Sequence, residues 1–589
     1  MPSSSIARRR VATYQGALFR ALFPNLACRE SHEYHNLTVA LQPLHQPAPA
    51  VTGISLFKRR AAEGLKSCKS RGARDGHSMK IASDDRLPVL RLGLLTAVAL
   101  AIHGYHLGVE DAEIHIPAAK KLLHPFLYPY ADEFFLSHGN LSLFDPILVW
   151  SARLTHLSMD WTISLWYVAT LFATLTACWI LAAACFRSPR ARWCSLLVIT
   201  AVLTMPATNT GLLLMDPYLT PRSLSTPLIV VALVCFLRHR YAMAGSGVLA
   251  AAAIHPQMAA YFVALTGVIW IEEKYGSAIR QRVPDLVTVS SVLPVGFMSL
   301  NPAQGAYREA LYARDFFFLS NWTWYHWLGM IAPLAILAFF WKGRLRETTP
   351  DFQRLSFALI PFGLLSILVA AVFDCSPALD MFARFQPLRC FHLITLVFVV
   401  LFGGVVGEYA AKGRRWVLPA LSLPLAAGMF YVSRQTYPFS PQIELPWLST
   451  SSNPWVNTLL WVRHNTPTDA VFAVDSRYFK DQGVDVHGFR SISERSTLPD
   501  YFKDGGVVAM FPSLAGDWKQ MSDATYGLNH FSAEDFTRLA KQYPVTWTVI
   551  HGSAPDGMEC PYQQDGYAVC RIPGAPGLTT DTLQASTGE

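Results

Sequence analysis

The chain passes from an apolar run to an acidic loop at residues 87–115, LPVLRLGLLTAVALAIHGYHLGVEDAEIH. The run 87–107 has the length needed to cross a bilayer, which takes about 20 apolar residues. It leads into Glu110, Asp111, Glu113 and His115, where a membrane segment would emerge into water. Charge is costly to hold in place at a membrane boundary, so this loop is a candidate functional site.

The rest of the chain has the composition of a membrane protein. Hydrophobic residues make up 52% of it, charged residues only 15%, and the mean hydropathy is +0.26, unlike a soluble globular chain. Apolar runs near membrane-spanning length recur, and we predict a polytopic α-helical membrane protein with about 11 transmembrane helices. The fifth and sixth of these could instead be one helix broken at His255-Pro256. The runs are 87–107, 162–186, 193–207, 223–237, 242–254, 258–271, 286–300, 324–341, 355–373, 390–406 and 416–432.

Basic residues are concentrated in alternate predicted connections. Short cytoplasmic loops of membrane proteins are enriched in lysine and arginine. The pattern therefore predicts a cytoplasmic N-terminus, with the acidic loop and the C-terminal tail on the extracytoplasmic side. The cations are Arg187, Arg190, Arg192, Arg238, Arg240, Lys274, Arg280, Arg282, Lys342, Arg344, Arg346, Arg354, Lys412, Arg414 and Arg415.

These patterns divide the chain into regions. Residues 1–86 are rich in arginine and lack the apolar core of a secretory signal. We interpret them as a disordered or misannotated extension, with a cleaved organellar targeting segment as the alternative. The helical membrane domain would cover 87–434, and its first outer loop would cover 109–160. A C-terminal extracytoplasmic α/β domain would cover 440–589.

The loop and the tail have their own predicted elements. The loop predicts a surface helix at 113–123 and an interfacial helix at 144–157. In the tail, Cys560 and Cys570 flank a turn and could close a disulfide outside the cytoplasm. The tail patterns predict helices at 453–463 and 532–542, and strands at 470–475, 545–550 and 567–572.

The acidic loop offers two kinds of chemistry. Asp111 and Glu110 could act as a general base with a raised pKa, or could bind a divalent cation such as Mg²⁺ or Mn²⁺. Asp132 and Glu133 could supply a second anionic point from the same loop. The alternative is an ordinary solvated loop, since acidic residues favour the start of a helix. No set of metal ligands is assigned.

Arginines on the same predicted side of the membrane as the acidic loop suggest that a phosphate-bearing ligand binds there. Arg222, Arg384 and Arg389 lie near helix starts, where paired N–H donors can hold phosphate. The alternative is anchoring to lipid headgroups. His255 interrupts an apolar stretch, and it either lines a cavity or is a hydrogen-bonded structural histidine.

The chain resembles the C-type (GT-C) membrane glycosyltransferases. The resemblance covers about residues 87–575 and includes a first helix, a long outer loop that opens with paired acids, about eleven spans and an α/β tail. Its local phrases are Glu110-Asp111, His255-Pro256, Gln386-Pro387-Leu388-Arg389, Asn465-Thr466-Pro467 and Asp469-Ala470.

The resemblance implies transfer of a sugar from a polyprenyl-phosphate carrier to an acceptor on the outer face of a bacterial inner membrane. Asp111 or Glu110 would be the base, Arg389, Arg384 or Arg222 would hold the carrier phosphate, and a divalent metal would be optional. The bilayer and the lipid-linked sugar are the expected partners, and no nucleic acid is expected.

Two other classes stay open. A transporter or flippase usually places ionisable groups near the bilayer midplane, whereas the predicted spans here are almost free of charge. A non-catalytic envelope membrane protein, whose tail binds a partner, is also compatible with the sequence.

Overall fold

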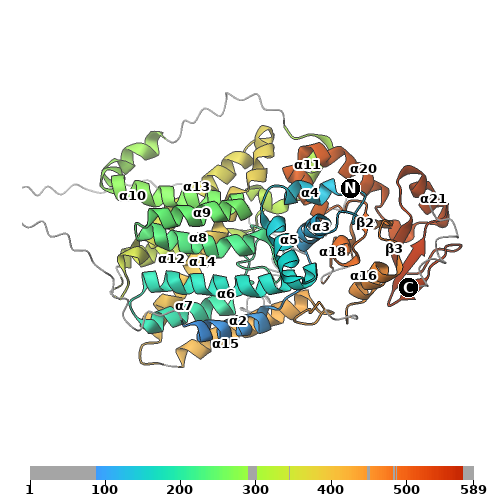
Figure 1. The fold of residues 1–589 in the computed structure, drawn as a ribbon. Coiled ribbons are helices and arrows are strands. Elements are labelled where there is room, and N and C mark those ends of the chain that lie inside the picture. Colours follow the sequence, from blue (N-terminus) through green and yellow to red (C-terminus); the bar gives the residue numbers. More distant parts are fainter. Residues whose placement is uncertain are drawn as a thin grey trace, which may run out of the picture. The chain divides into compact units, whose positions relative to one another are not determined.

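The computed structural model describes residues 88–289, 302–343, 345, 347–414, 416–446, 451–481, 485 and 487–574. The proposed extension 1–86 therefore lies outside the described residues, as does most of the predicted span 286–300. Every other predicted span falls on a helix of the bundle (Figure 1). The helices are α2 (Val89–His103), α6 (Met159–Cys185), α7 (Pro189–Ala201), α8 (Pro221–Leu237), α9 (Tyr241–Ile254), α10 (Pro256–Val289), α12 (Trp324–Gly343), α13 (Pro350–Asp374), α14 (Phe391–Val405) and α15 (Val417–Thr436).

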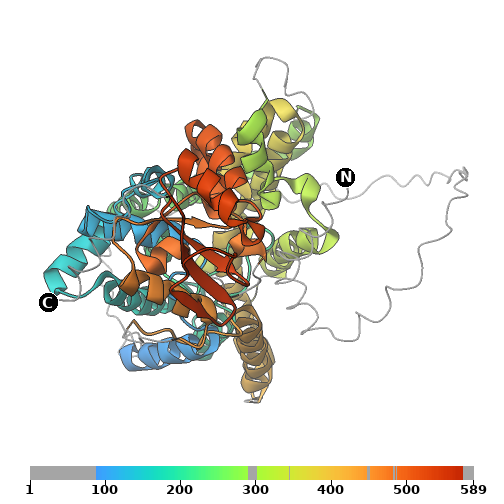
Figure 2. The ribbon, with the colours of Figure 1, turned by 90° about the vertical axis from the view of Figure 1, so that its right-hand side faces the viewer.

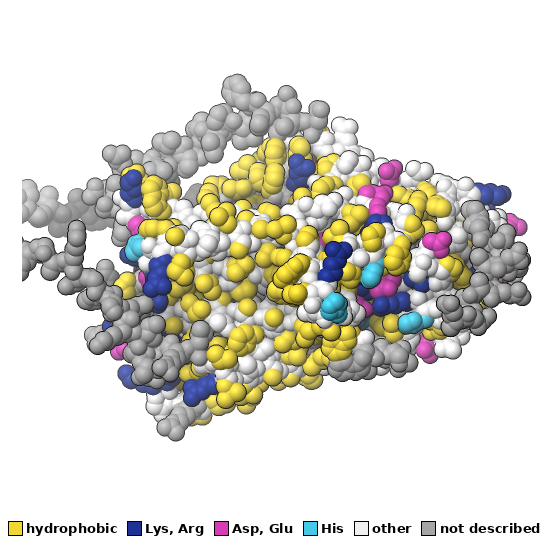
Figure 3. All heavy atoms as spheres, in the orientation of Figure 1, with side chains coloured by type: hydrophobic (Ala, Val, Ile, Leu, Met, Phe, Trp, Pro, Cys, Tyr) yellow, Lys and Arg dark blue, Asp and Glu magenta, His cyan; other side chains and the backbone are white. Residues whose placement is uncertain are grey.

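Several of these helices are long and apolar enough to cross a membrane. Among the described residues there are five: α6, α12, α13, α15 and the stretch Pro377–Ala410, which contains α14. Hydrophobic side chains are spread over the visible surface of the bundle, with few charged side chains among them (Figure 3). The chain is thus a mostly helical protein with membrane-type helices, and the total of about eleven crossings stays a prediction.

Local signals explain where the helices begin and break. The Ser158 and Thr349 side chains accept hydrogen bonds from backbone N–H groups of the first turns of α6 and α13, which satisfies donors that have no partner inside a helix. Thr220 and Ser223 form a capping box on α8. The break expected at His255-Pro256 is present, because α9 ends at Ile254 and α10 begins at Pro256.

Three of the predicted basic connections contact one another at one end of the bundle. Arg190, in the first turn of α7, has its Nη2 atom 3.1 Å from Oε1 of Glu408, in the segment after α14. Phe186 forms a β-bridge with Thr348, just before α13. Lysines and arginines are visible at this end in Figure 3, and charges of both signs gather towards the tail.

The acidic loop forms three short helices between the bundle and the tail (Figure 1). They are α3 (Ala112–Leu123), α4 (Glu133–Gly139) and α5 (Phe144–Thr155). The first and third lie where the sequence predicted helices. Asp111 and Asp132 are the N-cap residues of α3 and α4, as expected for acids at a helix start.

The tail folds around a five-stranded sheet of order β2-β1-β3-β5-β4 (Figure 2). The central strand β1 is parallel to β2 and β3, whereas β5 is antiparallel to β3 and β4. The sequence predicted β1, β3 and β5 but missed the very short β2 and β4. The strands are β1 (Val471–Val474), β2 (Ser496–Thr497), β3 (Trp547–His551), β4 (Tyr562–Gln564) and β5 (Tyr567–Arg571).

Helices cover both faces of this sheet. Successive residues of β1 point to opposite faces: Phe472 belongs to a buried cluster with Trp455, and Ala473 to another with Trp518. Cys560 and Cys570 form the predicted disulfide. The tail helices are α16 (Pro454–Asn465), α17 (Tyr478–Asp481), α18 (Phe489–Ser493), α19 (Lys503–Met510), α20 (Ala515–Ala524) and α21 (Ala533–Gln542); α11 (Gly305–Tyr312), from before α12, packs against α19 and α20.

Candidate active site

A tight turn presents the acidic pair. Gly108 has a φ of +81°, and a Cβ there would lie 2.7 Å from Ser491 Oγ, so the position requires glycine. Glu110 has a φ of 53°, a left-handed conformation that is uncommon for glutamate and is often found at functional sites. The turn leaves the Glu110 and Asp111 side chains 55% and 44% exposed. Both carboxylates are therefore accessible.

A lysine from the tail bridges the two acids. Lys503, the first residue of α19, forms an ion pair with Glu110, and its Nζ lies 3.1 Å from Asp111 Oδ1. Partial burial of the Asp111 side chain acts to raise its pKa, but the Lys503 ammonium outweighs this effect and holds the pKa below its usual value. The sequence left a raised pKa open as one of two possibilities for these acids. It could not show the lowering, because the lysine lies 392 residues away in the sequence.

Three arginines add positive charge to the same place. Arg222, in the first turn of α8, forms an ion pair with Asp216, and its charge also lowers the pKa of Asp111. Arg314 and Arg389 both interact electrostatically with Asp111. Within the described part of the chain, neither of these two forms an ion pair, and the Nε atom of each is buried without a hydrogen-bond partner.

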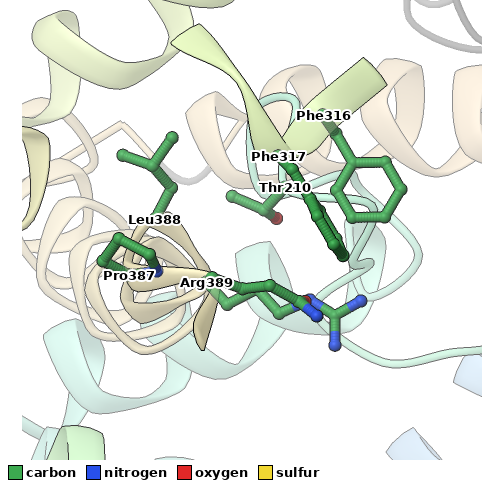
Figure 4. Close-up of a pocket in the computed structure, with 7 residues that line it drawn as sticks. Thr210, Phe316, Phe317, Pro387, Leu388 and Arg389 are labelled. Carbon is green, nitrogen blue, oxygen red and sulfur yellow. The ribbon is translucent and has the colours of Figure 1, made fainter. Parts of the chain in front are cut away.

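A small cavity adjoins Arg389. Its volume is about 10 Å³, which is room for about one water molecule. Figure 4 shows the Arg389 side chain extending towards Phe316 and Phe317, and its guanidinium lies 5.8 Å from the centre of the Phe316 ring. The cavity is lined by Thr210, Phe316, Phe317, Gln386, Pro387, Leu388 and Arg389.

Other predicted site residues have different partners. The guanidinium of Arg384 lies over the Phe385 ring at 5.5 Å and interacts with Tyr307. Asp132 forms an ion pair of 2.8 Å with Lys121. These contacts do not connect either residue with Asp111.

The remaining two predicted residues also lie in local contacts. Glu133 is in the first turn of α4, where its charge acts on Tyr130. His255 Nδ1 accepts the backbone N–H of Met258 at 3.3 Å, which caps the start of α10. His255 nevertheless interacts electrostatically with Arg222 and Arg389, so it lies at the edge of the site.

Glu113 lies outside the site although its sequence position suggested otherwise. Its side chain is 1% exposed. Oε1 accepts the backbone N–H and the Nε–H of Arg490, at 2.8 and 3.0 Å, and Oε2 accepts the Ser491 N–H at 2.9 Å. Arg490 continues to Asp504 through two bonds of 2.7 and 2.8 Å. Glu113 therefore docks the tail onto the loop.

A second charged network strengthens this docking. Lys120, on α3, lies 2.8 Å from Asp160 and 2.9 Å from Glu494. Arg463, on α16, contacts the same two carboxylates at 3.1 and 2.8 Å. Loop and tail thus form one interface, and this interface places Lys503 beside Asp111.

The residues that complete the site could not be found from the sequence. Lys503 follows no motif and lies in a tail whose periodicity indicates only helices and strands, and the same holds for Arg490 of the docking interface. Lys503 also occupies the position between Glu110 and Asp111 that a bridging cation would take. Among the described residues, Glu444, Asp485 and His487 form the group that could hold a metal.

Comparison with known proteins gives a remote likeness of fold. No protein-family profile matches the chain, and no curated protein is significantly similar to it. Two crystal structures of ArnT from Cupriavidus metallidurans are similar at 13% identity, and each comparison covers 82% of this chain and 97% of that one. The TM-score is 0.39 for ArnT bound to undecaprenyl phosphate and 0.36 for the apo state.

Proposed function

We propose that this protein is a GT-C-type glycosyltransferase that moves a sugar from a polyprenyl-phosphate carrier to an acceptor hydroxyl. One observation carries the proposal: Asp111 is an accessible carboxylate surrounded by Lys503, Arg222, Arg314 and Arg389, next to a bundle of apolar helices. The carboxylate could accept a proton, the cations could bind a phosphate, and the apolar helices could contact a lipid chain.

The charges favour an anionic ligand. Lys503 pairs with the two loop acids and Arg222 with Asp216. That leaves Arg314 and Arg389 without a carboxylate partner in the described part of the chain. Their Nε atoms are also buried without a hydrogen-bond partner, which is costly unless a ligand supplies an acceptor. Guanidinium groups bind phosphate through paired N–H donors, so a carrier phosphate would satisfy both charge and hydrogen bonds.

The proposed reaction is a single displacement. The acceptor oxygen attacks C1 of the sugar, its proton passes to the Asp111 carboxylate, and the bond between C1 and the phosphate oxygen breaks. The bonding electrons leave with the phosphate, whose growing negative charge Arg314 and Arg389 stabilise. General-base catalysis of this kind contributes about 10² to 10⁴ in rate.

Lys503 would act by exchanging partners. In the structure its ammonium is bound by Glu110 and Asp111. The ion pair keeps Asp111 ionised but occupies the carboxylate. A phosphate arriving beside Arg389 would attract the same ammonium. Lys503 would then release the Asp111 carboxylate for the acceptor hydroxyl.

The basic connections extend the proposal to topology. They lie at the end of the bundle away from the acidic loop, which would place that end and the N-terminus in the cytoplasm of a bacterial inner membrane. The active site and the tail would then face the extracytoplasmic side. Labelling of single cysteines with a membrane-impermeant maleimide at Glu133 and at Arg240 checks this, because only the Glu133 position should react in intact cells.

The decisive experiment compares variants in cells. Lipid-linked sugars and envelope glycans are measured by mass spectrometry in a host lacking the protein, and rescue by wild type is compared with rescue by Asp111→Asn. Asp132→Asn, a carboxylate of the same loop paired with Lys121, is the matched control, and membrane levels are equalised. We expect wild type and Asp132→Asn to restore the missing sugar and Asp111→Asn to fail.

Two results would contradict the proposal. Equal rescue by Asp111→Asn would remove that residue from the chemistry. If no glycan or lipid-linked sugar changes in the host lacking the protein, the enzyme proposal gives way to a transporter or a non-catalytic envelope protein.

The phosphate site has its own binding test. Undecaprenyl phosphate is titrated into the purified protein, and Arg389→Gln is compared with Arg384→Gln, whose guanidinium lies over Phe385 instead. Loss of a charge-assisted hydrogen bond costs about 1.5–3 kcal/mol, so Arg389→Gln should bind about 10- to 100-fold more weakly. Equal affinities of the two variants would place the phosphate elsewhere.

A further inference from the structure

A second cluster of ionisable side chains lies where three chain segments meet. Glu444 follows α15, whereas Asp485 and His487 precede α18 in the tail. One ligand atom from each of the three lies within 4.8 Å of the others. His106, from the turn after α2, adjoins them, because its Nδ1 lies 3.3 Å from Glu444 Oε1. The candidate active site uses none of these four residues.

The cluster is buried and its side chains are held in place. The His106 and His487 side chains are 0% exposed and that of Glu444 is 13% exposed. Glu444 also accepts the Leu107 N–H at 3.0 Å. Asp485 accepts hydrogen bonds from the Ser440 hydroxyl and from two backbone N–H groups. Outer hydrogen bonds of this kind orient the ligands of metal sites.

The cluster brings polar atoms together in a buried place. Two carboxylates, Glu444 and Asp485, lie beside two imidazole rings, and His106 Nε2 is buried without a hydrogen-bond partner in the described part of the chain. Buried carboxylates require a compensating positive charge, and a divalent cation can supply it.

The spacing of two ligand pairs and the atom types of the cluster fit a metal ion. His487 Nε2 lies 2.9 Å from Glu444 Oε2, and His106 Nδ1 lies 3.3 Å from Oε1. Ligands bound to a tetrahedral zinc ion at about 2.0–2.1 Å are about 3.3 Å apart. Imidazole nitrogen together with carboxylate oxygen favours zinc, whereas magnesium and calcium prefer oxygen ligands alone.

We propose that Glu444, Asp485 and His487, with His106 beside them, bind a zinc ion that fastens the tail to the acidic loop. His487 forms a β-bridge with Val109, and the Gly488 N–H donates to Gly108 O at 2.7 Å. These contacts lie directly before Glu110 and Asp111. The ion therefore fixes the turn that presents the acidic pair, and its site is independent of the sugar chemistry.

Metal content of the full-length protein tests this proposal. The protein is purified in detergent through a tag without histidines, dialysed against metal-free buffer and measured by mass spectrometry for zinc, manganese, magnesium and calcium. We expect about one zinc per chain, falling below about 0.2 in Glu444→Gln and in His487→Gln. Glu494→Gln, which alters the same loop–tail interface through Lys120 and Arg463, should keep its zinc. Asp111→Asn should keep it too.

A second measurement does not depend on the variants. Wild type stripped by a chelator is heated with added zinc chloride or with magnesium chloride. Zinc alone should raise the unfolding temperature, because a ligand of the folded state stabilises it. The proposal is overturned if wild type neither carries nor binds zinc, or if Glu444→Gln carries as much as wild type.

Discussion

Asp111 and Glu113 lie two residues apart at the start of one helix, yet their surroundings differ completely. Asp111 is 44% exposed and meets one flexible lysine. Glu113 is 1% exposed and accepts hydrogen bonds from Arg490 and from two backbone N–H groups. The first carboxylate contacts one lysine and reaches solvent, whereas the second cannot move without breaking three hydrogen bonds with Arg490 and Ser491.

The two acids thus differ in burial and in the number of donors that hold them. A third carboxylate of the same loop, Asp145, is buried with no hydrogen-bond partner for either oxygen among the described residues. Burial raises its pKa to about 7. Among the described residues, Asp111 thus has a solvent-accessible ion pair, Glu113 has a buried ion pair, and Asp145 has none.

The largest effect should come from neutralising the fixed acid. Glu113→Gln removes one of the two carboxylates that pair with the buried Arg490 and leaves a buried N–H donor without its acceptor, which costs about 3 kcal/mol. Asp111→Asn removes only a half-exposed ion pair, worth at most about 1 kcal/mol. Unfolding of the two variants in detergent, measured by intrinsic tryptophan fluorescence, checks this difference. If both lose the same stability, the contrast between them is wrong.

The unpaired acid should respond to pH in the opposite sense to a paired one. The pKa of Asp145 is higher in the folded protein than its usual 3.8, so the folded state binds the proton more tightly. The contribution of Asp145 to the free energy of unfolding is therefore fully present below about pH 4. It is lost as the pH rises to about 7, which lowers the free energy of unfolding by on the order of 3 kcal/mol. Asp145→Asn should lose less stability than wild type between pH 5 and pH 8. Parallel pH profiles would show that the carboxyl is solvated.

The close approach of loop and tail can be tested at Gly488. A Cβ at this position would lie 2.6 Å from Glu113 Cβ, so Gly488→Ala should cost about 1–3 kcal/mol through overpacking. Gly516, in α20, has open space around its Cβ position, and Gly516→Ala should be neutral or slightly stabilising. Thermal unfolding of both variants provides the comparison. A neutral Gly488→Ala would mean that loop and tail are more loosely docked.

The smallest effect concerns the ion pair between Lys503 and Asp111. Lys503→Gln removes the charge that lowers the pKa of Asp111, so this pKa should rise towards or above its usual value. Because the base acts when deprotonated, the pH below which activity is lost should rise by about one unit. Lys519→Gln, a lysine paired with Asp523, is the control. An unshifted profile would show that Lys503 does not act on the base.

Local patterns in the sequence were enough for much of the fold. The apolar runs predicted the bundle helices, including the break at His255-Pro256. The tail pattern predicted a helix at 532–542, which is α21 and begins with a capping box of Ser532 and Asp535. Short strands such as β2 and β4 were missed, because two or three residues carry too little periodicity. These signals depend only on residues close in the sequence, so they can be recognised without knowledge of the tertiary contacts.

The sequence by itself determined that an acidic pair follows the first apolar helix and that arginines could face it. Only the tertiary structure decided which charge meets which. Lys503 reaches Asp111 across 392 residues, and Arg490 reaches Glu113 across 377. The physical reason is that a carboxylate has the same local signature whether it becomes buried or accessible, since its partner is chosen by the packing of distant segments.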